Sequence, residues 1–241
     1  SNGKLRPLGI ASYEDKIVQL ALKKVLEAIY EPRFLNCMYG FRPNRGCHGA
    51  VKELYKRLNF TKICYIVDAD IKGFFDHMKH DWIMKFLNLY IKDPNILWLV
   101  NKYLKAGVMD EGKLVENEEG SAQGNIISPI LANIYMHNVL TLWYKFIIAK
   151  ESRGENFLIV YADDFIAGFQ YKWEAEKYYK LLRNEWKSSD WNWRKARAGC
   201  WKAEDIWQNR SRNAENQQGW NQSISLDLHF IAEGQGKEQH G

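Results

Sequence analysis

The feature that most constrains this chain is the tetrapeptide Tyr161-Ala162-Asp163-Asp164, which lies between two apolar, β-prone runs. Residues 157–160 precede it and residues 165–169 follow it. Two such runs around a short Asp-containing break predict a β-hairpin whose turn carries adjacent carboxylates. Hard cations such as Mg²⁺ prefer carboxylate oxygens. Asp-Asp is also ordinary turn chemistry, so the motif alone leaves both a metal site and a structural turn open.

A second predicted strand, residues 63–70, also ends in acid. It is rich in β-branched and aromatic residues, and Asp70 stands at its C-terminal end. One interpretation is a strand running into a turn, with Asp76 as a helix N-cap. That interpretation does not explain an acid at a strand end followed five residues later by the aromatic Phe75. Two independent acidic segments therefore favour a shared cation site.

These segments belong to five ordered blocks over residues 4–170 that resemble the fingers and palm of reverse transcriptases, closest to the group II intron-encoded type. The blocks are Arg6–Ile10 with Glu14–Gln19, Tyr39–Pro43 with His48 and Ala50, Asp70–Asp76 with His80, Gly120–Pro129 running into Leu131–Tyr135, and Tyr161–Asp164. One departure is Ala122, where many relatives have Pro. We expect it to alter loop stiffness and not chemistry.

The resemblance implies a catalytic site formed by Asp70, Asp163 and Asp164. These carboxylates would bind two Mg²⁺ ions, with Mn²⁺ as a substitute, and support nucleotidyl transfer by in-line displacement. In this role one ion activates the primer 3′-hydroxyl and the other holds the triphosphate and the leaving pyrophosphate.

The resemblance also implies nucleotide-binding roles for Lys4, Arg6, Phe75, Gln123 and Gly124. Lys4 and Arg6 would grip the incoming triphosphate, or they are solvated basic residues. Phe75 would exclude a 2′-hydroxyl by steric contact, or it is a core residue. Gln123 would contact the sugar, and Gly124 would let the backbone approach closely.

Three further polar residues, Arg42, Arg45 and His48, follow or lie within the second block. They are interpreted either as contacts to RNA backbone or as parts of a polar fingers loop, because surface arginines need no ligand.

The order of segments predicts an α+β fold of the reverse transcriptase fingers-palm type, with an antiparallel palm sheet and packed helices. Apolar periodicity predicts a helix from Ser12 to before Pro32, and further helices at 47–58, 79–90, 93–105, 128–149 and 172–185. Residues 4–10 are expected to form the return strand of a hairpin. We expect N-terminally truncated fingers over 1–60, a palm over 61–185, and an atypical, disordered segment over 186–241.

Composition agrees with a protein that binds a polyanion in a reducing compartment. The net charge is +5, and the four cysteines show no close pairing, so no zinc ribbon or disulfide framework is implied. No signal peptide opens the chain, which predicts a cytoplasmic location. The apolar stretch 126–149 contains Asn133, His137 and Lys145, so a buried helix is favoured over a membrane span.

The C-terminal stretch departs from the pattern. Six of the ten tryptophans follow Glu185, without proline or apolar periodicity, and the relatives' Phe-Leu-Gly-Phe-type motif is missing. Read in a shifted frame, codons for residues 223–228 with His229 permit Asp-Phe-Leu-Gly-Phe-Thr, and the segments 185–193 and 196–202 permit further family-like sequence. We infer a reading-frame slip near residues 182–185. The alternative is a genuine Trp- and Arg-rich tail that stacks on RNA bases.

The sequence supports two classes of function. The first is an RNA-directed DNA polymerase of a group II intron that also assists splicing and mobility. Its partners would be an RNA template, a DNA primer, deoxynucleoside triphosphates and intron RNA. The second is a catalytically poor, RNA-binding maturase fragment. A reverse transcriptase of a retron or of a diversity-generating retroelement also remains open. Primer extension on an RNA template separates the first two classes.

Overall fold

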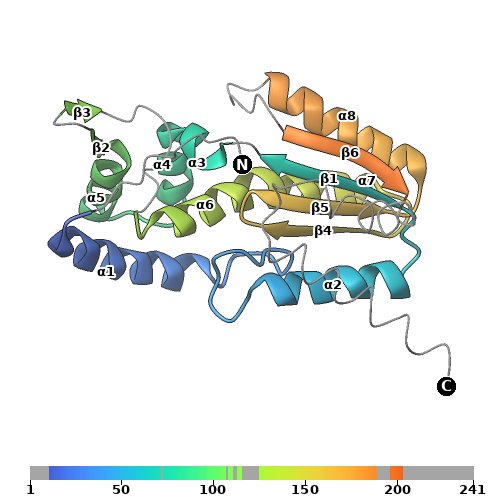
Figure 1. The fold of residues 1–241 in the computed structure, drawn as a ribbon, viewed down its shortest axis with the longest axis horizontal. Helices are drawn as coiled ribbons and strands as arrows, with labels where there is room; N and C mark the ends of the chain where they lie inside the picture. Colours follow the sequence, from blue (N-terminus) through green and yellow to red (C-terminus); the bar gives the residue numbers. More distant parts are fainter. Residues whose placement is uncertain are drawn as a thin grey trace.

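The structure, a computed structural model, describes residues 11–71, 73–106, 108–110, 113–115, 125–188 and 196–202. The main sheet of this part is antiparallel, with strand order β4-β5-β1-β6 (Figure 1). Its strands are β1 (Tyr65–Ile71), β4 (Asn156–Tyr161), β5 (Asp164–Phe169) and β6 (Ala196–Lys202). A separate small hairpin pairs β2 (Val108–Asp110) with β3 (Lys113–Val115). The strands and helices together form the predicted α+β fold.

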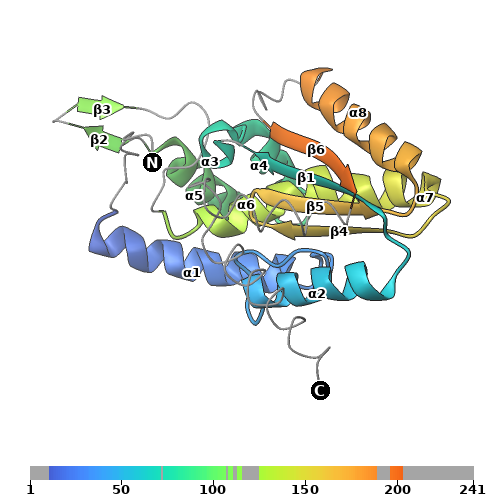
Figure 2. The same ribbon diagram turned by 45° about the vertical axis from the view of Figure 1, so that its right-hand side comes forward.

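Helices cover both faces of the main sheet (Figures 1 and 2). Helix α2 (Cys47–Phe60) packs on one face, where its buried residues join those of β1 and β4 in a small apolar cluster. The other face packs against α6 (Ser128–Met136) and α8 (Lys172–Ser188) in the main core. The remaining α-helices are α1 (Tyr13–Tyr30), α3 (Phe74–His77), α4 (His80–Asn88), α5 (Pro94–Lys105) and α7 (Ala149–Glu151).

The ends of α1 show how local sequence and packing act together. Ser12 caps the helix, because its Oγ accepts a hydrogen bond of 3.2 Å from the backbone N–H of Asp15. Leu22 and Leu26 follow at helical spacing and are buried. At the last turn the Tyr30 hydroxyl donates to the backbone carbonyl of Phe86 on α4, at 3.0 Å. Helix α1 is thereby joined to the helices beside the sheet.

The predicted helix 128–149 is present but is not a regular α-helix. After α6 the chain forms two π-helical turns, η1 (His137–Thr141) and η2 (Tyr144–Ile148), before α7. Such turns each accommodate an extra residue and are frequent at functional sites. Nearly all of α6 is buried, as expected for an internal helix. No helix in the described part of the chain combines the length and apolar character that a bilayer span requires.

Two described segments fall inside the region for which the sequence predicts disorder. Helix α8 continues to Ser188, and β6 pairs along the whole of β1, from Tyr65 opposite Lys202 to Ile71 opposite Ala196. Residues 196–202 therefore form the edge strand of the main sheet, which apolar periodicity did not predict. The rest of the segment 186–241, and the return strand predicted at 4–10, lie outside the described residues.

Candidate active site

Asp70 and Asp164 lie directly opposite each other on the neighbouring strands β1 and β5. Strand alternation places Asp68 and Asp70 on one face of β1, while Ala69 and Ile71 point into the main core. The side chain of Asp70 interacts with that of Asp164 and is one of the causes that raise the pKa of Asp164. The fold thus brings together two of the three predicted carboxylates.

The environment of Asp164 is unfavourable for its own negative charge. Burial is the main cause, followed by the negative charges of Asp163, Asp70 and Asp68, and together they raise the pKa of Asp164 to about 7. All of these charged neighbours are carboxylates, so a cation would relieve their repulsion. Asp68 is a member of this cluster that sequence reasoning missed, although its position two residues before Asp70 on a strand was a usable signal.

The chemistry of this donor set fits a hard divalent cation, because Mg²⁺ is coordinated by carboxylate oxygens. Asp163 belongs to the turn, and its backbone carbonyl accepts a hydrogen bond of 3.3 Å from the N–H of Ile71. Among the described residues, no group of three or more His, Cys, Asp or Glu side chains is arranged to hold a metal ion.

The turn that carries Asp163 has a strained backbone. Ala162 has a φ of 57°, which residues other than glycine rarely adopt, and it is buried. Such a conformation persists only where the surrounding structure holds it.

The segment that holds this turn is residues 37–42, here called the supporting loop. The backbone N–H of Val160 donates to the carbonyl of Cys37, and the N–H of Tyr39 donates to the carbonyl of Val160, both at 2.8 Å. Gly40 then packs against the turn so closely that a Cβ at this position would lie 2.3 Å from the backbone nitrogen of Ala162. Only glycine fits there without displacing the turn.

Two side chains hold the supporting loop in turn. Asn133 of α6 donates from Nδ2 to the carbonyl of Gly40, at 2.9 Å. Arg42 is buried and forms an ion pair of 2.7 Å with Glu31, and it also donates to the backbone carbonyl of Met38 at 3.0 Å. The interpretation of Arg42 as an RNA contact is therefore wrong, because its guanidinium group is used inside the protein.

Arg45 is also engaged, with hydrogen bonds of 2.8 Å to the backbone and side-chain oxygens of Asn36, and it lies over the ring of Tyr39. These contacts favour the interpretation of Arg45 as part of a polar loop. His48 is exposed on α2, and its predicted RNA contact stays a prediction.

Gln19, the last residue of the first block, makes a contact that the sequence did not predict. It is buried on α1, and its Oε1 accepts a hydrogen bond of 2.8 Å from the backbone N–H of Ile126. This contact fixes the start of the segment that leads into α6. The preceding residues Gln123 and Gly124, like Lys4 and Arg6, lie outside the described residues, so their nucleotide-binding roles stay predictions.

Phe75 lies on α3, close to the end of β1, and is half-buried. Its ring contacts the rings of Phe74, at 5.4 Å, and Phe41, at 6.3 Å, edge to face. Partial burial keeps both interpretations of Phe75, as a core residue and as a steric gate. Asp76 lies within α3, whose N-cap is Gly73, so the interpretation of Asp76 as an N-cap is wrong.

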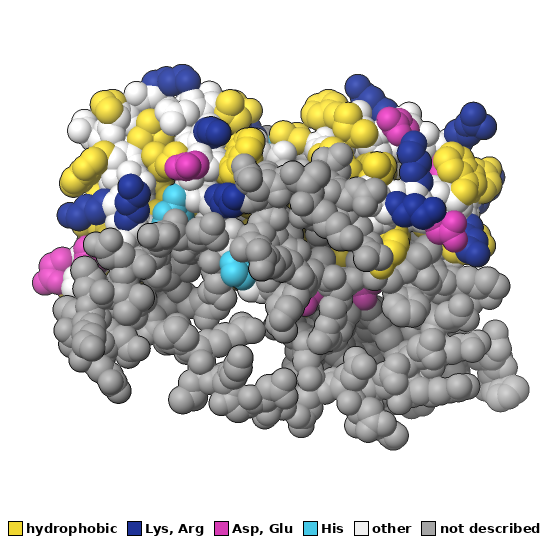
Figure 3. Space-filling view, turned by 90° about the horizontal axis from the view of Figure 1, so that it is seen from above, with side chains coloured by type: hydrophobic (Ala, Val, Ile, Leu, Met, Phe, Trp, Pro, Cys, Tyr) yellow, Lys and Arg dark blue, Asp and Glu magenta, His cyan; other side chains and the backbone are white. Residues whose placement is uncertain are grey.

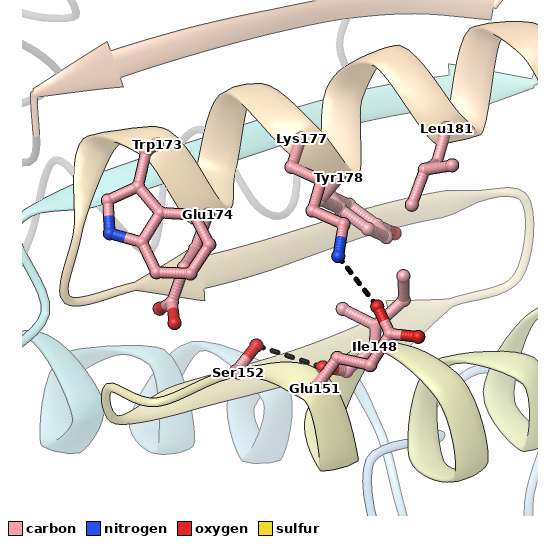
Figure 4. A pocket seen from close by; sticks show the side chains of 8 residues that line it. All are labelled: Ile148, Glu151, Ser152, Trp173, Glu174, Lys177, Tyr178 and Leu181. Carbon is pink, nitrogen blue, oxygen red and sulfur yellow. Dashed lines mark hydrogen bonds and ion pairs between the residues drawn. The ribbon is translucent and has the colours of Figure 1, made fainter.

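A small pocket lies at the other end of the β4–β5 hairpin from the Ala162–Asp163 turn. It is lined by Ile148, Glu151, Ser152, Trp173, Glu174, Lys177, Tyr178 and Leu181 (Figure 4). An ion pair of 2.7 Å between Lys177 and Glu151 crosses it. It contains none of the predicted catalytic or nucleotide-binding residues and is separate from the carboxylate cluster.

Comparison with known proteins gives the family. Residues 1–199 match the family described as "Reverse transcriptase (RNA-dependent DNA polymerase)". Group II intron-encoded protein LtrA of Lactococcus lactis subsp. cremoris is 42% identical over 147 residues, which are 59% of this chain and 24% of that protein. Protein YkfC of Escherichia coli (strain K12) is 31% identical over 209 residues, 86% of this chain and 51% of that protein. The chain thus spans about a quarter of LtrA and half of YkfC.

Solved structures agree with the fold. A telomerase from Candida tropicalis, truncated from its C-terminal domain, matches with a TM-score of 0.53 and 18% identity, over 78% of this chain and 40% of that one. The family match reaches residue 199, past the reading-frame slip predicted near residues 182–185, and the slip stays a prediction. Because the match covers most of its length and includes the paired strands that bear Asp70 and Asp164, the chain belongs to the reverse transcriptase family.

Proposed function

We propose that this protein is an RNA-directed DNA polymerase whose catalytic carboxylates are Asp70, Asp163 and Asp164. The observation that carries the proposal is the direct pairing of Asp70 with Asp164, beside a turn that presents Asp163. Two Mg²⁺ ions, or Mn²⁺ in their place, would supply Lewis-acid activation of a 3′-hydroxyl and charge neutralisation at the leaving pyrophosphate.

The chain's own contribution is mainly positioning. The paired strands fix Asp70 and Asp164, and the supporting loop fixes the turn before Asp164. Preorganised charge of this kind lowers a barrier because it need not rearrange during the reaction. We extend the proposal to Phe75 as the gate against a 2′-hydroxyl, and to Lys4, Arg6, Gln123 and Gly124 as contacts to the nucleotide.

The proposed partners are an RNA template, a DNA primer, deoxynucleoside triphosphates and intron RNA. The net charge of +5 favours a polyanion, and Lys and Arg side chains lie at both ends of the face drawn in Figure 3, mixed with hydrophobic and acidic ones. Intron RNA is supported by the name of the Lactococcus relative, a group II intron-encoded protein. We further propose that the whole protein assists intron splicing and mobility.

Primer extension on an RNA template tests the proposal. Asp163→Asn removes one anionic ligand, so extension is expected to fall by orders of magnitude while RNA binding, which rests on distributed basic residues, persists. Asp81→Asn, at an exposed position on α4, is the matched control. Loss of RNA binding and of extension to the same degree in Asp163→Asn would show that Asp163 is structural.

A second candidate is an RNA-binding maturase function without efficient polymerisation, which the intron-encoded relatives also support. Absence of primer extension by the parent protein, together with tight binding of intron RNA, would favour this candidate. Extension restricted to one structured template would instead favour a retron or a diversity-generating retroelement.

A further inference from the structure

Phe41, in the supporting loop, has a strained backbone conformation, and burial of its own side chain does not account for that strain. Its φ is 54°, a region that bulky residues rarely adopt. Its side chain is 45% exposed, so the fold gains less from its ring than from a core aromatic. Strained backbone of this kind is held by its surroundings and gathers at functional sites.

The ring of Phe41 contacts the proposed sugar gate. Its centroid lies 6.3 Å from that of Phe75, with the two planes at 71°. Both values are typical of attractive edge-to-face pairs. Phe75 makes a similar contact, at 5.4 Å and 72°, with the buried Phe74 of its own helix. The gate ring is therefore in contact with one ring from α3 and one from the supporting loop.

The loop can act as a rigid support because both neighbours of Phe41 are fixed. Gly40 is pressed against Ala162 and accepts a hydrogen bond of 2.9 Å from Asn133. Arg42 is buried and paired with Glu31 at 2.7 Å. The same short loop thus contacts the turn of the carboxylate cluster and the ring beside it.

We propose that Phe41 is a specificity-determining positioning residue, which restrains the ring of Phe75 and thereby strengthens discrimination against ribonucleoside triphosphates. The inference rests on the proposed function. Steric exclusion discriminates only as far as the excluding group resists displacement. A ring that contacts the gate from a fixed loop supplies that resistance without contacting the nucleotide.

The test is single-nucleotide addition to a DNA primer on an RNA template, with kcat/KM measured for a deoxyribonucleotide and for the matching ribonucleotide. The ratio is expected to fall about threefold to tenfold in Phe41→Ala and Phe41→Gly, the size expected for loss of one aromatic pair. Phe41→Tyr keeps the ring and should keep the ratio. Asn44→Gly is the matched control, because it relieves a φ of 58° in the same α1–α2 connection but outside the supporting loop. It should also keep the ratio.

Thermal midpoints measured alongside separate unfolding from loss of restraint, because glycine adopts positive φ without steric cost. If Phe75→Ala lowers the ratio while both Phe41→Ala and Phe41→Gly match the parent, the inference is overturned and the proposed function stands. An equal fall in Asn44→Gly also overturns it, since the effect would then belong to the whole connection. A parent protein that extends no primer overturns the proposed function and this inference together.

Discussion

The carboxylates at the two ends of the β4–β5 hairpin lie in opposite environments. At the turn, Asp164 is half-buried, and the charged neighbours that shift its pKa are other carboxylates. At the far end, Glu174 is buried, and its Oε1 accepts hydrogen bonds from the backbone N–H groups of Arg153, at 2.6 Å, and Gly154, at 3.3 Å. Nearby, Glu151 is paired with Lys177 (Figure 4).

The difference separates the acid that we propose to be catalytic from acids that hold the fold. Oε1 of Glu174 closes the connection into β4 through its two backbone hydrogen bonds, while Oε2 is buried without a hydrogen-bond partner among the described residues. The cluster around Asp164 costs stability, because like charges are collected where burial penalises them. A fold retains such a cluster where a cation or substrate completes it, which agrees with the proposed polymerase site.

The largest expected effect comes from exchanging an acid for its amide at each end. Asp164→Asn should reduce primer extension by orders of magnitude, since a metal ligand is lost, while the thermal midpoint stays the same or rises as repulsion is relieved. Glu174→Gln should lower the free energy of unfolding by about 1–3 kcal/mol through weaker bonds to the backbone. Its extension rate per folded molecule should be retained. Both are measured by thermal denaturation and primer extension.

The contrast between the two ends of the hairpin would be contradicted if Asp164→Asn destabilised the protein as much as Glu174→Gln does. Asp164 would then be a structural acid. The contrast would also be contradicted if Glu174→Gln abolished extension in a fully folded sample.

A second test moves the turn without changing any charge. Gly40→Ala places a Cβ 2.3 Å from the backbone of Ala162, so the turn or the supporting loop must shift. We expect a loss of about 2–3 kcal/mol in the free energy of unfolding, the usual cost of overpacking, and a larger proportional loss of extension. Gly49→Ala is the matched control, because its Cβ meets only the Tyr39 ring, at 3.4 Å. In helix α2 that change should stabilise by up to about 1 kcal/mol. Equal stability of Gly40→Ala and the parent would contradict the close packing of loop and turn.

Sequence reasoning predicted what depends on local pattern. The hairpin around Asp163, the strand ending in Asp70 and the main helices follow from alternation, helical spacing and capping residues. It missed what depends on contacts between distant segments. Nothing local shows that Arg42 is buried against Glu31, or that Gly40 meets Ala162 more than a hundred residues later.

The π-helical turns and strand β6 were missed for related reasons. The apolar spacing of residues 128–149 fits a continuous helix, and only packing reveals the extra residue in each π-turn. Strand β6 is positioned by pairing with the free edge of β1, and its own residues show no apolar alternation that would predict a strand.

A third test uses pH and a titrating group that belongs to neither end of the hairpin. His137 in η1 is buried, with Nδ1 3.0 Å from Thr141 Oγ1 and its ring against Phe34. Burial, and then the positive charges of Arg42 and Lys145, lower the pKa of His137 from 6.5 to about 4. Between these values the unfolded chain binds the His137 proton more readily, so the contribution of His137 to stability is full above pH 6.5 and is lost as pH falls towards 4. The loss has an upper limit of about 3 kcal/mol.

Chemical denaturation at several pH values measures this dependence. His137→Gln should flatten the curve between pH 4 and 6.5, while His77→Gln, at an exposed position, should leave it unchanged. The raised pKa of Asp164 gives the opposite slope in the same range, so the difference between the parent and His137→Gln curves is the diagnostic quantity. A difference that stays constant between pH 4 and 6.5 would show that His137 titrates normally.

The smallest expected effect concerns β6, which borders the carboxylate end of the hairpin because Arg197 pairs in register with Asp70. Ending the chain after Ser188 removes β6 and makes β1 an edge strand. The free energy of unfolding should then fall by about 1–2 kcal/mol, because the stabilisation by the lost hydrogen bonds exceeds the entropy that is regained when the strand is no longer ordered. Ending it after Lys202 should leave the thermal midpoint nearly unchanged. If residues 186–241 come from a shifted frame and were never selected for packing, both truncations should match the parent instead. A midpoint that falls only when β6 is removed would show that residues 196–202 contribute to the sheet, whatever the origin of their sequence.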